Sequence, residues 1–136
     1  MSEILTIKKG TELELEIDSL AYGGMGLAKK DSFVIFVKNA IPGQRVKAFI
    51  YKKKKGYAEA RVIEVIGESP HAEKVKCSHY WICSKIQSLT YEQQLNEKER
   101  QVEEAFQRLG GFGDFKLNDI KSADPIYYYR NKMEFT

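Results

Sequence analysis

Four consecutive lysines, Lys52–Lys55, form the densest run of like charge in the chain, and Arg45, Lys47 and Arg61 lie close to them in sequence. Cations of this kind bind a phosphate backbone by displacing counterions. Tyrosines beside such cations offer flat surfaces on which bases stack. The pattern therefore predicts a nucleic-acid contact made by these residues: Tyr22, Arg45, Lys47, Lys52, Lys53, Lys54, Lys55, Tyr57 and Arg61. The alternative is a solvated hairpin tip with tyrosines packed on its flanks.

A glycine-rich loop, Tyr22-Gly23-Gly24-Met25-Gly26, precedes the lysine run. It lacks the Lys-Ser/Thr pair of a nucleotide-binding P-loop and opens no helix, so nucleotide binding is not predicted. Glycines at such a position are typical of a bulge or barrel corner where a side chain does not fit. A second role, backbone N–H groups near an RNA phosphate, stays open.

Cys77, His79 and Cys83 form the third group of chemically active residues. Two thiolates and one imidazole fall short of the four ligands of a closed zinc site. Buried packing of the two cysteines is the simpler interpretation. A metal-binding or redox adaptor that uses these three side chains remains the alternative.

The elements that position these residues are short strands. Residues 12–17 alternate charged and apolar side chains, which is typical of a half-buried strand. Leu27 resumes the sheet, residues 33–37 are wholly apolar, and Pro42-Gly43 has the composition of a type II turn. Two further strands, residues 46–51 and 57–66, flank the lysine run. Five short strands in fewer than 60 residues predict a closed, OB-like β-barrel.

The second half of the chain has a different pattern. The segment 67–71 ends the barrel, and we place a domain boundary at 68, followed by an irregular linker at 77–86. Thr90 and Gln93 resemble a capping box, and apolar residues then recur at helical spacing over 91–109, up to Gly110 as a C-cap. Residues 126–136 are expected to be extended. The predicted fold class is mainly β with one helix (α+β).

Charge and composition limit the function. Residues 1–70 hold 12 Lys and Arg against 9 Asp and Glu, while residues 71–136 hold 10 of each, so the excess positive charge belongs to the barrel. This favours an anionic partner for the N-terminal half. Residues 1–10 have no apolar signal-peptide core, and no apolar run approaches a membrane span. With two cysteines and no signal peptide, we expect a reducing, cytoplasmic location and no membrane partner.

The order of strands, glycine loop and basic hairpin resembles a TRAM domain, a small β-barrel RNA-binding module. Beyond residue 68, three further pieces are similar to the bacterial RNA (uracil-5-)-methyltransferases, of the 23S rRNA type. They are Cys77-x5-Cys83, Gln87-x-Leu89-x-Tyr91 and the run Tyr-Arg-Asn-Lys-Met-Glu-Phe at residues 129–135. The resemblance covers essentially the whole chain in the family's order.

This resemblance implies that the TRAM domain holds RNA by phosphate contacts and base stacking. The parent enzyme is then expected to use S-adenosylmethionine, to flip a uracil out of its stack and to methylate its C5. None of the family's catalytic motifs lies in these 136 residues. We therefore expect a truncated N-terminal piece of a longer enzyme, inactive alone and without a catalytic residue. A stand-alone TRAM RNA-binding protein is the alternative.

Many members of that family hold a [4Fe-4S] cluster with Cys-x5-Cys-Gly-Gly-Cys and a distant fourth cysteine. Cys77 and Cys83 match the first two positions, but Ser84 stands where the third cysteine is expected. Because the irons of such a cluster need cysteine thiolates, two are insufficient. We expect no metal site or cluster in this chain.

Two further expectations concern partners. Arg130 and Lys132 match family positions near the RNA-facing central domain, although they could equally alternate outward along a strand. Ribosomal RNA is the family's commoner substrate and transfer RNA the rival. We also expect self-association of this chain through the apolar stripe of the helix or through an unpaired terminal strand.

Overall fold

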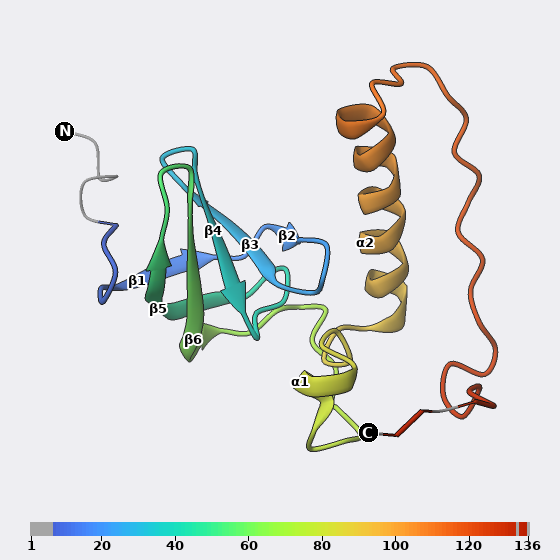
Figure 1. Ribbon diagram of the computed structural model, residues 1–136. Coiled ribbons are helices and arrows are strands. Elements are labelled where there is room, and N and C mark those ends of the chain that lie inside the picture. The colour runs from blue at the N-terminus through green and yellow to red at the C-terminus, as the bar shows by residue number, and fades with distance from the viewer. Residues whose placement is uncertain (1–6, 133, 136) are drawn as a thin grey trace.

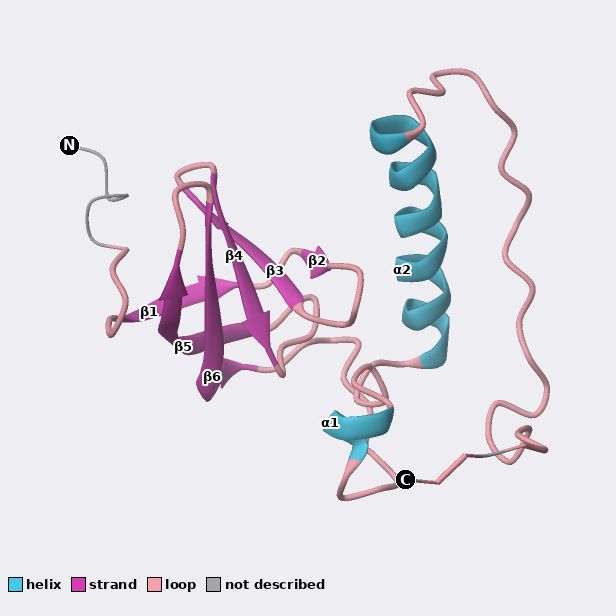
Figure 2. Cartoon of the chain, in the orientation of Figure 1, coloured by secondary structure: helices cyan, strands magenta, loops and turns pink. Residues whose placement is uncertain are grey.

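The computed structural model describes residues 7–132 and 134–135. Figures 1 and 2 show a twisted sheet, one long helix beside it, and a C-terminal segment that returns along the far side of the helix. The six strands lie in the order β1-β5-β6-β4-β3-β2. Their bounds are β1 Glu12–Glu16, β2 Ser19–Leu20, β3 Gly26–Lys30, β4 Phe33–Lys38, β5 Arg45–Lys53 and β6 Tyr57–Gly67.

The sheet is mixed and open, which corrects the expectation of a closed, five-stranded barrel. β4 pairs with β6 in parallel, and the other neighbours are antiparallel. The two edges, β1 and β2, are successive pieces of one stretch of chain. Between them the Ile17 N–H donates to the Gln44 carbonyl at 2.9 Å and the Asp18 N–H donates to the Leu27 carbonyl at 2.8 Å. The chain thus changes partner strand at this point, so the sheet curls without an edge-to-edge ladder.

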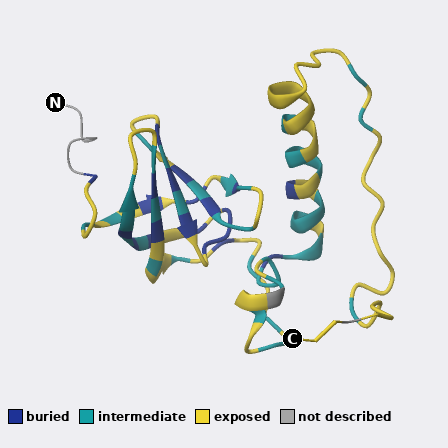
Figure 3. Ribbon diagram, viewed as in Figure 1, coloured by how far each residue is buried: buried dark blue, intermediate teal, exposed yellow. Residues whose placement is uncertain are grey.

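The core lies on the concave face of the sheet, where alternate residues of β4, the first part of β5 and the first part of β6 are buried (Figure 3). Strand β4 shows the alternation although its sequence is wholly apolar: Ile35 and Val37 are fully buried, but Val34 and Phe36 are only half-buried. The core cluster comprises Ile7, Leu15, Ile17, Ala28, Phe33, Ile35, Val37, Ala40, Val46, Ala48, Ile50, Ala58 and Ala60. Each buried large aliphatic side chain contributes about 1.5–3 kcal/mol.

The predicted turn at Pro42-Gly43 is confirmed by its backbone. Gly43 has a φ of +88°, in the left-handed region that a type II turn requires. A Cβ atom built on Gly43 would also lie 2.8 Å from the Ser69 Oγ, so a larger residue does not fit. Ser69 in turn donates its hydroxyl to the Pro42 carbonyl. This bond holds the chain that leaves β6 against the turn and so closes the β-module, by which we mean the sheet of strands β1–β6.

The helical part begins with α1 (Tyr80–Cys83), a single turn inside the segment expected to be irregular. The long helix α2 (Tyr91–Glu104) continues as a π-helical turn, η2 (Ala105–Leu109), so the predicted range of 91–109 is confirmed. The capping box is wrong, because Thr90 makes no side-chain cap. The Gln93 amide donates to Glu97 instead, at 3.3 Å. Gly110 is the C-cap, as predicted, and its N–H donates to the Ala105 carbonyl at 3.1 Å. The left-handed residue that follows is Gly111, with a φ of +69°.

Helix α2 packs against the sheet with its polar face. Glu97, only 6% exposed, accepts the backbone N–H of Leu20 at 3.1 Å. The Leu20 carbonyl accepts Arg100 Nη2 at 2.7 Å and Gln101 Nε2 at 3.1 Å. Since Leu20 lies in the edge strand β2, these bonds satisfy backbone groups that an edge would expose.

The C-terminal segment returns beside α2 and η2 (Figure 1), and two side chains of these helices contact it. The rings of Phe106 and Phe115 lie 5.3 Å apart, and the Tyr91 hydroxyl accepts the Ala123 N–H at 2.7 Å. Residues 110–132 and 134–135 contain no strand, so the described part of the segment that we expected to be extended pairs with no other strand. No helix within the described ranges is long and apolar enough to span a membrane.

Candidate nucleic-acid interface

The convex face of the sheet carries a row of aromatic rings across β4, β6 and β5. The rings of Phe36 and Tyr57 meet edge to face, with centroids 5.7 Å apart and planes at 73°. The parallel ladder sets them on neighbouring strands, since Val34 pairs with Tyr57 and Phe36 with Glu59. Phe49 and Tyr51 extend the row on β5, in positions that alternate with the buried Ala48 and Ile50. Faces of this kind offer successive surfaces for base stacking.

Cations lie over three of the sheet's rings. Lys38 Nζ lies 4.9 Å from the centroid of the Tyr51 ring, and the Arg61 guanidinium carbon lies 5.3 Å from that of Phe49. Lys53 Nζ lies 4.4 Å from the ring of Phe33. These cation–π contacts hold positive charge beside the rings while leaving it available to a phosphate.

Two of the predicted cations are already paired with carboxylates. Lys52 Nζ lies 2.7 Å from Glu59 Oε1, and Lys47 Nζ lies 2.8 Å from Glu12 Oε2. The hydrogen bond from Lys52 lowers the pKa of Glu59, and the same bond raises the pKa of Lys52. The hydrogen bond to Glu12 raises the pKa of Lys47. A phosphate that binds either lysine competes with a carboxylate.

A β-bulge brings Tyr51 and Lys52 to the same carboxylate. The register of β5 against β6 shifts between Ile50 and Lys52, which leaves Tyr51 without a ladder partner. The Tyr51 hydroxyl donates to Glu59 Oε2 at 2.9 Å. Burial, and then this hydrogen bond, raise the pKa of Tyr51 to about 12. Strict alternation along β5 would have placed these two consecutive side chains on opposite faces.

The lysine run forms the tip of the β5–β6 hairpin, as predicted. The Lys54 N–H donates to the Tyr57 carbonyl at 2.8 Å and closes the turn, with Lys54 and Lys55 exposed. The turn between β3 and β4 lies at the same end of the sheet (Figure 1). The ladder explains this, because the parallel strands β4 and β6 both begin there.

The structure brings part of the predicted set together and separates the rest. Lys52, Tyr57 and Arg61 lie on the convex face, with Lys54 and Lys55 at the adjoining hairpin tip. Lys53 pairs with the buried Ala58 and lies over Phe33 at the edge of the core. Arg45 lies at the opposite end of β5, opposite Gly67, and Tyr22 lies in the β2–β3 loop. Arg130 and Lys132 lie in the exposed C-terminal segment, where Lys132 approaches Glu134 at 3.9 Å.

Three residues of the convex face, Lys38, Phe36 and Phe49, were missed by the sequence analysis. Phe36 could have been found from the strand period, because alternate residues of the apolar run in β4 must face outward. Lys38 ends that strand in the same outward phase as Phe36.

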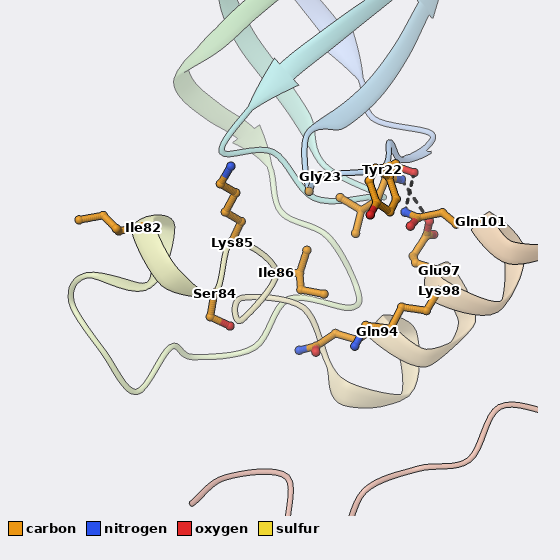
Figure 4. A pocket seen from close by; sticks show the side chains of 12 residues that line it. Tyr22, Gly23, Ile82, Ser84, Lys85, Ile86, Gln94, Glu97, Lys98 and Gln101 are labelled. Atoms are coloured by element: carbon orange, nitrogen blue, oxygen red, sulfur yellow. Dashed lines mark hydrogen bonds between the residues drawn. The ribbon is translucent and has the colours of Figure 1, made fainter. Parts of the chain in front are cut away.

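The glycine-rich loop forms one wall of a separate cavity of about 460 Å³ (Figure 4). Tyr22 in this loop is 95% exposed. Figure 4 shows the Lys85 side chain extending toward the loop that carries Gly23, with Lys98 on α2 across the cavity. Gly24 has a φ of +89°, and a Cβ atom there would lie 3.2 Å from the Lys85 Cβ. The close approach favours the interpretation of these glycines as a structural corner.

The cysteine segment gives little support to a metal centre. The His79 N–H donates to Cys77 Sγ at 3.3 Å, and Cys77 is a free, half-buried thiol. The part of the chain that the structure describes contains no group of three or more His, Cys, Asp or Glu side chains that could hold a metal ion. The Cys83 side chain lies outside what the structure describes. The described donors therefore do not fit a four-thiolate cluster.

The fold is that of a small, OB-like β-sheet unit, and its convex face combines aromatic rings with cations. Residues 7–63 match the family model of the TRAM domain, so this part of the chain belongs to the TRAM domain family.

Similar proteins extend the resemblance beyond that domain. The chain is 37% identical to an uncharacterised RNA methyltransferase of Clostridium tetani, over 97% of this chain and 29% of that protein. It is 35% identical to one of Bacillus cereus, over 94% of this chain and 28% of that protein, and 37% identical to one of Porphyromonas gingivalis, over 90% and 27%. The chain thus spans less than a third of the length of these relatives.

A solved structure is also similar in sequence. The solution structure of a conserved protein of Methanococcus maripaludis is 33% identical, covering 43% of this chain and 83% of that chain, with a TM-score of 0.41.

Proposed function

We propose that residues 1–68 bind RNA on the convex face of the sheet, with bases stacked on the aromatic row and phosphates held by the β5–β6 hairpin. The observation that supports this best is the interleaving of rings and cations over β4, β6 and β5, as in the pairs Lys38–Tyr51 and Arg61–Phe49. Surfaces of this composition bind single strands with little sequence preference.

The chain is proposed to serve a longer enzyme. The similar RNA methyltransferases support a role as the RNA-holding N-terminal part of an S-adenosylmethionine-dependent uracil-C5 methyltransferase of the cytoplasm. Ribosomal RNA of the 23S type is the proposed substrate, with transfer RNA as the rival. The methyl donor and the catalytic residues belong to the remainder of that polypeptide.

Binding is tested by titrating single-stranded, uridine-containing RNA at several salt concentrations. We expect log affinity to fall linearly with log salt, by about 0.7 for each phosphate contact. Combined replacement of Lys53, Lys54 and Lys55 by Ala should lower the magnitude of that slope by about 2. The matched control replaces three exposed lysines outside the sheet by Ala: Lys74, Lys116 and Lys121. Undetectable binding at low salt, or equal slopes for both variants, contradicts the proposal.

Self-association through α2 is proposed as a second property of the isolated chain. Val102 on α2 and Phe106 on η2 each remain 45% exposed. Light scattering at increasing concentration tests it, with Val102→Ser expected to shift the chain toward the monomer. A monomer at every concentration contradicts self-association and leaves the RNA proposal unaffected.

A further inference from the structure

A groove of about 650 Å³ separates the β2–β3 end of the sheet from the C-terminal end of the long helix. One wall is formed by the sheet and its loop, and the other by α2 and η2. The residues that matter for its chemistry are Tyr22, Leu27, Lys29, Val34, Arg108 and Leu109. We propose that this groove continues the RNA-binding surface, with Lys29 and Arg108 as phosphate contacts and Tyr22 as a stacking surface. This inference rests on the proposed function.

The groove is continuous with the aromatic row. Leu27 on β3 is opposite Phe36 on β4, and Phe36 meets Tyr57 on β6. Lys29 on β3 is opposite Val34 on β4, so both strands of this pair contribute residues to the groove. Neighbouring strands lie about 4.8 Å apart, so a strand of RNA that crosses from β6 reaches the groove after about 10 Å.

The free charge of the groove is positive. Arg100 pairs with two carboxylates, with Nη2 2.8 Å from Glu97 and Nη1 2.8 Å from Glu104, so these three groups together carry one negative charge. Lys29 and Arg108 outweigh it. Lys29 and Arg108 are exposed and take part in no ion pair within residues 7–132. Two unpaired cations at one groove favour a polyanion over an acidic side chain or an apolar partner.

The groove also offers apolar surface at the places that bases would reach. Tyr22 is 95% exposed and Leu109 is 90% exposed, on opposite walls. Leu27 and Val34 form a half-buried floor between them. Cations at the rim and rings or aliphatic groups within are the composition of single-strand channels.

The helical wall is held in place before any ligand binds. Glu97, Arg100 and Gln101 fasten α2 to both backbone polar groups of Leu20 in β2. Since Tyr22 follows two residues later, the loop and the helix keep a fixed separation. A preformed groove spends less binding free energy on ordering its walls.

RNA length distinguishes binding in the groove from binding on the sheet alone, because only a longer strand can reach both. We compare oligouridines of about 4 and about 12 nucleotides, two lengths within the range of site sizes of OB-type modules. The variants are Arg108→Ala, Lys29→Ala and Tyr22→Ala, with Lys74→Ala as the charge-matched control and circular dichroism as the test of folding. For the longer RNA, each cation variant should lower the salt slope by about 0.7. Tyr22→Ala should weaken its binding by about 5- to 150-fold. The shorter RNA should lose affinity only when the β5–β6 lysines are replaced.

Several outcomes overturn the inference. If the longer RNA binds all three variants as tightly as the unmodified chain, the RNA-binding surface does not include the groove, while the proposed function stands. The same conclusion follows if both lengths lose affinity equally. If Arg108→Ala changes only the oligomeric state, the groove is occupied by a second copy. If neither RNA binds the unmodified chain, the proposed function itself fails and the groove loses its basis.

Discussion

The carboxylate of Glu97 accepts the backbone N–H of Leu20 at 3.1 Å, across 77 residues of sequence. The same carboxylate receives Arg100, whose guanidinium also donates to the Leu20 carbonyl. Both backbone groups of one edge residue are therefore satisfied by side chains of α2. A buried carboxylate with this set of donors joins the helix to the β-module.

Replacing Glu97 by Ala should destabilise the protein by about 1–3 kcal/mol, because the Leu20 N–H and Arg100 lose their buried acceptor. The midpoint of chemical unfolding measures this loss. Hydrogen exchange at Leu20 should also become faster. Glu103→Ala is the matched control, since Glu103 is exposed on the same helix. Equal effects for the two variants would show that the bond to Leu20 contributes nothing.

Replacing Tyr57 by Ala should weaken RNA binding by about 5- to 150-fold, because a stacking surface is removed. Tyr57→Phe keeps the ring that meets Phe36 and should bind nearly as the unmodified chain does. Fluorescence anisotropy with a labelled single strand measures both. A large loss for Tyr57→Phe would mean that the hydroxyl, and not the ring, makes the contact.

Replacing Glu59 by Gln should strengthen RNA binding. The substitution removes a negative charge from the convex face and releases Lys52 from its 2.7 Å ion pair. One more available cation should raise the magnitude of the salt slope by about 0.7. Glu103→Gln on α2 removes the same charge away from the sheet and is the control. Unchanged affinity and slope for Glu59→Gln would place Lys52 outside the RNA contact.

The same carboxylate should make stability depend on pH. The hydrogen bonds from Lys52 and Tyr51 lower the pKa of Glu59 below its ordinary value of 4.5. Its contribution is therefore complete above that value and is lost as the pH falls through the lowered pKa. Thermal midpoints should fall more steeply between pH 5 and pH 3 for the unmodified chain than for Glu59→Gln. Parallel curves would show that the pair does not couple to folding.

Iron content tests the cysteine segment. Two cysteines in the whole chain cannot supply four thiolates, so protein purified anaerobically should hold far less than one iron–sulfur cluster per chain. Elemental analysis and the visible absorption spectrum measure this. Stoichiometric iron or zinc would instead promote Cys77 and His79 as ligands.

Local patterns predicted the β-module well because each strand has its own signal. Alternation in residues 12–17, the Pro42-Gly43 turn and the lysine-tipped hairpin are all short-range features. Closure was predicted wrongly because it depends on pairing between distant segments. At Ile17 and Asp18 the chain exchanges one partner strand for another, and no local pattern reports that exchange.

The helix shows the opposite case. Its range was evident from apolar spacing, but that spacing does not report that the polar side of the helix packs on the sheet. The side chain that becomes most buried is Glu97, which hydropathy alone assigns to solvent. Only the unpaired backbone of β2 explains this, and the position of that edge follows from the three-dimensional arrangement. The aromatic row was partly hidden for a related reason, since Phe36 lies in a run with no polar residue to mark its outward face.

Because β4 and β6 pair in parallel, the proposed RNA-binding surface exists only after the whole sheet has folded. Phe36 and Tyr57 become neighbours only after the intervening β5 has folded back, which is a slow, non-local event. A nascent chain that lacks β6 presents no assembled recognition surface. Substitutions that merely unfold the module should therefore reduce the fraction of competent molecules, while each competent molecule keeps its intrinsic dissociation constant.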